Sequence, residues 1–166
     1  ESAALAQRAK FLMERGRHAD ALALLKPGAS KGTLPPVAWQ MFIEASLAQA
    51  DAQQALDALP ALAKSQSLAA DAFAELENRV MMAALGSAPS QARLNALWSG
   101  IGRNRRKQPA VIAAFARRAA HFGQTLAAMD EIESAQRHEW NDSLALCYSD
   151  IGPAEMTTRT RHAEAW

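Results

Sequence analysis

The sequence has little of what builds disulfides, β-sheets or membrane spans. Its single cysteine, Cys147, excludes an internal disulfide and every motif that needs two cysteines. Valine and isoleucine together number eight, whereas alanine accounts for 39 of the 166 residues. Alanine favours helix because it loses no side-chain entropy there, while β-branched residues favour strands. No apolar run reaches the roughly 18 residues that cross a bilayer. The composition therefore predicts an all-α chain whose core is packed by alanine, leucine and methionine.

Charge and motif content exclude several classes of function. The formal net charge is +1 and the pI is about 8.2, so no overall nucleic-acid footprint is present. The sequence has no HExxH, GxSxG or CxxCH motif, and none of its four histidines lies beside Cys147 in a nucleophile arrangement. We therefore expect no catalytic residues, no metal site, no cofactor and no nucleic-acid partner.

The most informative feature is a repeat. The stretch that begins at Gly16 and includes Ala21 recurs, in a degraded form, from Ala50 through Ala55, and both spacings are 34 residues. A period of 34 is that of the tetratricopeptide repeat, in which each unit is a pair of antiparallel helices. Such repeats stack into a solenoid that usually binds protein. The period thus predicts a single tetratricopeptide-like domain over 1–166 and a non-enzymatic interaction module.

Stop signals divide the chain into four to five helical hairpins, of which the last is truncated. The predicted stops are Gly16, Ala50, Gly86, Gly123 and Gly152–Pro153, at spacings of 34, 36, 37 and 29 residues. Prolines are expected to end the second helix at Lys26 and to end or kink the helix that contains Pro60. The second hairpin is predicted to open at Pro35–Pro36, with 55–62 on its partner helix. The other helices are predicted over about 2–15, 19–26, 68–85, 89–101, 109–122, 126–137, 141–151 and, as a cut-off helix, 154–166.

Large apolar residues recur at the packing positions of these hairpins. Trp39, Phe42 and Ile43 form one such face, and Tyr148 occupies a packing position of the fifth hairpin. Tyrosine can ligate haem, but its place in the pattern favours core packing.

The polar positions one face away from the packing stripe are the candidate binding residues. The first helix of each hairpin lines the concave side of such arrays, and a wet recognition surface needs polar groups there. Ordinary amphipathicity also produces a polar side, so both interpretations stay open. Counted back from each stop, the inward positions are Lys10, Gln40, Glu44, Asn78 and Arg117.

A short basic run is the strongest charge feature. It contains Arg103, Arg105, Arg106 and Lys107 and lies in the predicted connector before Pro109. It could dock an anionic partner, a phosphate or lipid headgroups. A solvated connector is the preferred interpretation, because a run this short is weak evidence of binding.

The second half of the chain resembles a known family. The residues that carry the resemblance come in a fixed order: the segment 98–103, then Arg106, Pro109 and Val111, Ala116–Arg117, Gly123, Ala128, Ile132–Glu133, and finally Trp140, Leu144 and Tyr148. This order resembles the HemY family of proteobacteria, tetratricopeptide proteins associated with late haem biosynthesis. The segment 161–166 resembles that family's entry into its following repeats.

The resemblance implies a location and a role. It implies a bacterial inner-membrane protein whose N-terminal anchor is absent from this fragment, with the repeat domain on the cytoplasmic side. It further implies protein partners, namely haem-biosynthesis enzymes that the domain organises or regulates. Two alternatives are a carrier domain for haem or porphyrin and a generic tetratricopeptide scaffold of another membrane complex.

Overall fold

The structure, a computed structural model, describes residues 2–151, and all the regular secondary structure within them is helical, with no strand. The all-α prediction is confirmed. The predicted stop at Gly152–Pro153 and the helix over 154–166 lie outside the described residues. The chain divides into two compact units, Glu1–Ala83 and Ala84–Trp166, which we call unit 1 and unit 2 and describe separately.

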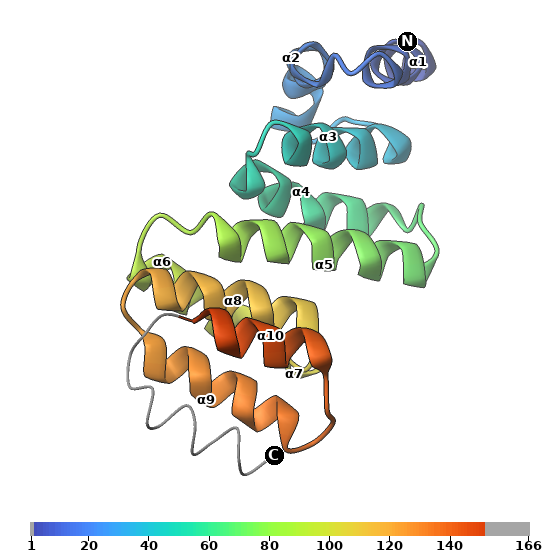
Figure 1. Cartoon of the computed structure of the whole chain (residues 1–166). Helices are drawn as coiled ribbons and strands as arrows, with labels where there is room; N and C mark the ends of the chain where they lie inside the picture. Colours follow the sequence, from blue (N-terminus) through green and yellow to red (C-terminus); the bar gives the residue numbers. More distant parts are fainter. Residues whose placement is uncertain (1, 152–166) are drawn as a thin grey trace. The chain divides into compact units, whose positions relative to one another are not determined.

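Unit 1 is built from two helical hairpins and a long following helix (Figure 1). α1 packs on α2, both pack on α3, and α3 packs on α4. Leu76 and Val80 of α5 join the same buried core as Trp39 and Leu59. The helices are α1 (Ser2–Glu14), α2 (His18–Ser30), α3 (Pro36–Ala48), α4 (Ala52–Ser65) and α5 (Ala70–Gly86), the last of which ends just beyond the unit boundary.

Unit 2 repeats part of this packing order. α8 packs on α9, and both pack on α10, just as α1, α2 and α3 pack on one another in unit 1. α6 and α7 contact the first helix of this set, α8. The helices are α6 (Gln91–Gly100), α7 (Arg103–Arg106), α8 (Pro109–His121), α9 (Thr125–Gln136) and α10 (Asp142–Asp150).

Three hairpins turn in the same way. Gly16, Ala50 and Gly123 all have positive φ, at 71°, 58° and 79°. In each case the residue's amide donates to the carbonyl three residues back, and the next amide donates to the carbonyl five residues back, at 2.9–3.0 Å. This is the Schellman motif, which satisfies the last carbonyls of a helix and favours glycine in the left-handed position. Gly86 ends α5 as predicted but has no positive φ, so the third turn differs.

A fully buried alanine follows each of these turns by five residues. Ala21, Ala55 and Ala128 all have 0% exposure. A methyl group lets the second helix of a hairpin approach the first closely, where a larger side chain would hold the two apart. The sequence repeat is therefore a repeat of turn geometry and of helix contact.

The helix end predicted at Pro27 is wrong, and so is the first of the two outcomes predicted for Pro60, an end or a kink. α2 continues through Pro27 to Ser30, and α4 continues through Pro60 to Ser65. Both prolines lie on the exposed side of their helix, where the missing N–H and the ring are best tolerated. α2 instead ends at Ser30 in another Schellman turn, in which Gly32 has a φ of +65° and the Thr33 amide donates to the Gly28 carbonyl at 2.9 Å.

Other predicted boundaries are close to the observed ones. Pro36 and Pro109 occupy the first turns of α3 and α8, and the Asn141 side chain caps α10 by accepting from the Leu144 amide at 3.1 Å. The segment 103–106, expected as a plain connector, instead forms the one-turn helix α7.

We predict that Ala50→Gly raises the free energy of unfolding by about 0.5–1 kcal/mol. Left-handed backbone costs an L-residue about 1–2 kcal/mol, and the entropy that glycine loses on folding offsets part of the gain. Urea denaturation measures the change. The control is Ala23→Gly in the exposed middle of α2, which should lower stability by about 1 kcal/mol. A loss of stability in Ala50→Gly would contradict the left-handed turn.

Trp39 should be a major source of stability in unit 1. It is 8% exposed and meets the Phe42 ring edge to face at 6.1 Å between centroids. Trp39→Ala is expected to cost about 3–5 kcal/mol in a denaturation experiment. Val37→Ala, at an exposed position of the same helix, should change stability by less than about 0.5 kcal/mol. A cost below about 1 kcal/mol for Trp39→Ala would mean that the assumed register of the hairpins is wrong.

Candidate functional site

The predicted inward positions of unit 1 lie on the solvent side of the first helices. Gln40 and Glu44 are one turn apart on the half-exposed stripe of α3, on a different side from the buried Trp39 and Phe42. Lys10 is exposed on α1 and lies 3.8 Å from Glu14 of the same helix.

One of these residues forms an ion pair between two hairpins. Arg79 of α5 donates from Nη1 to Glu44 Oε1 at 2.9 Å and from Nη2 to Glu44 Oε2 at 2.7 Å. The hydrogen bond to Glu44 raises the pKa of Arg79, burial opposes the rise, and the charges of Glu44 and Glu75 add to it. Bidentate pairing fixes both side chains in one geometry. Asn78, the fourth predicted position, precedes Arg79 directly and is half-buried.

Arg117, the fifth predicted position, lies in unit 2. It is exposed on α8. Burial raises the pKa of the Cys147 thiol, the charge of Arg117 partly opposes this rise, and the charge of Asp150 adds to it. The structure thus places only Glu44 of the predicted residues in an ion pair between helices, with Gln40 one turn before it on α3 and Asn78 next to its partner in sequence, and leaves Arg117 in the other unit.

The basic run does not form a uniform surface. Arg106 donates from Nε to the Ile101 carbonyl at 2.8 Å and from Nη2 to the Ser99 carbonyl at 2.7 Å. Its guanidinium also lies over the Trp98 ring, 5.7 Å from the ring centroid. Arg106 therefore caps the end of α6. Arg103 and Lys107 are exposed and Arg105 is half-buried.

Tyr148 is part of the core. It is 4% exposed, and its hydroxyl donates to Glu133 Oε1 at 3.2 Å. The prediction of a packing role is confirmed. Among the described residues, no group of three or more histidine, cysteine, aspartate or glutamate side chains could hold a metal ion.

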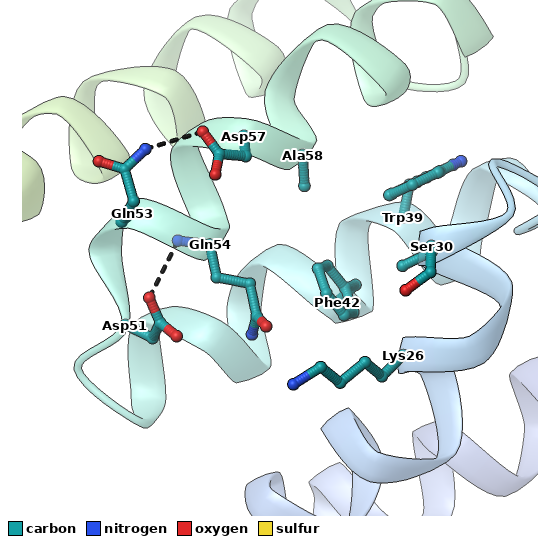
Figure 2. Close-up of a pocket in the computed structure, with 10 residues that line it drawn as sticks. Lys26, Ser30, Trp39, Phe42, Asp51, Gln53, Gln54, Asp57 and Ala58 are labelled. Carbon is teal, nitrogen blue, oxygen red and sulfur yellow. Dashed lines mark hydrogen bonds between the residues drawn. The ribbon is translucent and has the colours of Figure 1, made fainter.

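Unit 1 contains a groove that the sequence analysis missed (Figure 2). We call it the unit 1 groove; its volume is about 390 Å³. Figure 2 shows the Lys26 side chain reaching in from one side and Asp51 and Gln54 on the other, with the rings of Phe42 and Trp39 beside them. Asp51 accepts from the Gln54 amide at 2.9 Å, so this carboxylate is engaged in capping α4. The groove is lined by Lys26 and Ser30 of α2, Trp39 and Phe42 of α3, and residues of and just before α4 that include Asp51, Gln53, Gln54 and Asp57.

Unit 2 contains a larger cleft. We call it the unit 2 cleft; its volume is about 630 Å³. Arg106 and Lys107 are the only predicted site residues on it. It is lined by Arg106, Lys107, Pro109, Ile112, Glu131, Ser134, Ala135, His138, Glu139, Asn141 and Leu144. Sequence reasoning missed it because the contributing segments, 106–112 and 131–144, are 19 residues apart and share no motif.

Comparison of the chain with family models, with curated proteins and with solved structures finds no match. Within residues 2–151, none of the helices has the length and apolar content needed to cross a membrane.

The Glu44–Arg79 pair should couple α3 to α5 measurably. In a double-mutant cycle of Glu44→Gln and Arg79→Gln, we expect a coupling free energy of about 0.5–1 kcal/mol that shrinks with added salt, because both side chains are partly exposed. The reference is the Lys10–Glu14 pair, which is longer and more exposed, and should give about 0.3 kcal/mol or less. Equal coupling in the two pairs would contradict the bidentate geometry.

Proposed function

We propose that the chain is a tetratricopeptide-like array of helical hairpins that binds protein and catalyses no reaction. One observation carries the proposal: the Schellman turns at Gly16, Ala50 and Gly123, each followed by a buried alanine five residues later. The proposal is also supported by the packing order that both units share: the two helices of a hairpin pack on each other, and both pack on the helix that follows them. Repeats of this kind bind partners on the concave side of the array, which the first helices line.

The contacts that join positions about one repeat apart give further support. Glu44 pairs with Arg79, 35 residues away, and the Trp98 indole donates to Glu131, 33 residues away, at 3.1 Å. In stacked repeats, each unit contacts mainly its neighbour.

We further propose that the array belongs to a HemY-like inner-membrane protein and binds enzymes of late haem biosynthesis. The proposal rests on the order of residues from Trp98 to Tyr148 that resembles this family. The surface proposed for the partner is the solvent side of the first helices, where Lys10, Gln40, Glu44, Asn78 and Arg117 lie.

Capture from a proteobacterial membrane extract tests this function. The immobilised chain is expected to enrich a haem-biosynthesis enzyme, identified by mass spectrometry, and Lys10→Glu is expected to reduce the enrichment several-fold. Lys64→Glu makes the same change of charge on a second helix and should leave the enrichment unchanged. Failure to enrich any such enzyme would overturn the assignment of partner. Equal loss in the two variants would overturn the assignment of surface.

A further inference from the structure

The unit 2 cleft is lined by apolar side chains, which we call its floor, and by charged side chains of both signs: cationic ones from α7 and the residue after it, which we call the cationic wall, and acidic ones from α9 and the segment after it, which we call the acidic wall. Ile112 and Leu144 are almost fully buried beneath it, and Pro109 and Ala135 complete the apolar lining. Its volume of about 630 Å³ lies in the range of pockets that bind small molecules, roughly 300–1,000 Å³. Such pockets combine an apolar surface with a few polar groups that fix the orientation of a ligand.

The cationic wall is formed by Arg106 and Lys107. The Nε and Nη2 atoms of Arg106 are held by two main-chain carbonyls of the α6 end, and no contact within the described residues engages its Nη1 atom. Lys107 is exposed and has no ion-pair partner in the part of the chain that the structure describes. Two cationic side chains, Arg106 and Lys107, are thus available to bind a ligand.

The acidic wall is formed by Glu131 and Glu139. Glu131 is half-buried, and its Oε1 accepts from Trp98 Nε1 at 3.1 Å, which leaves Oε2 without a partner among the described side chains. Glu139 is exposed and likewise unpaired there.

Trp98 positions one charge of each wall. Its indole N–H holds Glu131, and the face of its ring lies beneath Arg106. The ring itself is fixed, because it is 7% exposed and stacks on Phe115 at 4.3 Å between centroids. A carboxylate and a guanidinium are therefore held apart by one rigid side chain, and a preorganised site binds at a lower entropic cost.

The separation of charge extends along unit 2. From residue 84 to residue 129 the sequence contains seven lysines and arginines and no acidic residue, whereas Asp130 to Asp150 contains six acidic residues and one arginine. The cleft lies where α7 and the start of α8 meet the end of α9 and the start of α10, so it joins the cationic and acidic segments. Even so, Arg106 and Lys107 form no ion pair with Glu131 or Glu139 among the described residues.

We propose that the unit 2 cleft binds small zwitterions, that is, molecules with both a carboxylate and an ammonium group, such as free amino acids and short peptides. The carboxylate of the ligand binds Arg106 and Lys107, and its ammonium group binds Glu131 and Glu139. The apolar floor takes the carbon skeleton. This activity is independent of the protein-binding function proposed above, since it requires neither the first-helix surface nor a haem-pathway partner.

Isothermal titration of the full chain with the twenty L-amino acids and a set of dipeptides tests the proposal. At least one compound is expected to bind with a Kd below about 1 mM, a binding free energy of about −4 kcal/mol. Tighter binding by an amino acid or by a dipeptide identifies which source of the shared chemistry the cleft prefers. If every compound has a Kd above about 10 mM, the proposal is wrong.

Matched ligands and variants test the roles of the two walls. The N-acetyl and carboxamide derivatives of the best ligand each lack one charge and should bind at least tenfold more weakly, as should Lys107→Gln and Glu131→Gln with the parent ligand. Glu131→Gln keeps an oxygen that can accept from Trp98, and Lys107 has no partner to lose, so both variants should fold normally. Lys64→Gln in unit 1 is the control and should bind as the unmodified chain does. Unchanged affinity of both derivatives would overturn the proposal.

Discussion

The structure depends on a three-residue turn that reverses the chain at Gly16, Ala50 and Gly123. A left-handed residue in this turn allows two amide-to-carbonyl hydrogen bonds that close the end of the first helix. The second helix then starts within two residues and places a fully buried alanine against its neighbours. This turn geometry sets the direction of the second helix of each hairpin. It thereby also determines which side of the first helix remains exposed to solvent.

The elements that could be predicted are those determined by local chemistry. The helical class follows from the alanine content, and the turns at Gly16 and Gly123 follow from the conformational freedom of glycine. The turn at Ala50 is predicted only by the 34-residue repeat, because alanine by itself does not indicate a turn. The helix ends predicted at Pro27 and Pro60 are wrong because the effect of a proline on a helix depends on its exposure. Both prolines face solvent, where a helix tolerates them.

The two recesses and the role of Arg106 could not be predicted in this way. In the sequence, Arg106 is one member of a basic run, but in the structure it donates to main-chain carbonyls at the end of α6. Every residue has a main-chain carbonyl, so the sequence does not indicate which ones an arginine will bind. The Glu44–Arg79 pair did leave a signal, a separation of 35 residues that is close to the repeat period. Opposite charges one period apart are therefore worth seeking in irregular repeats. The unit 2 cleft depends on a tertiary arrangement of three segments, which periodicity does not report.

The repeated hairpin turn is tested most directly by measuring backbone φ, from NMR chemical shifts and couplings, at the four predicted stops inside the described chain. The expected result is a positive φ at Gly16, Ala50 and Gly123 and a negative φ at Gly86. Ala50 decides the question, because an L-residue occupies the left-handed region only where the surrounding structure requires it. A negative φ at Ala50 would contradict the repeated hairpin turn, and with it the main support for a protein-binding array.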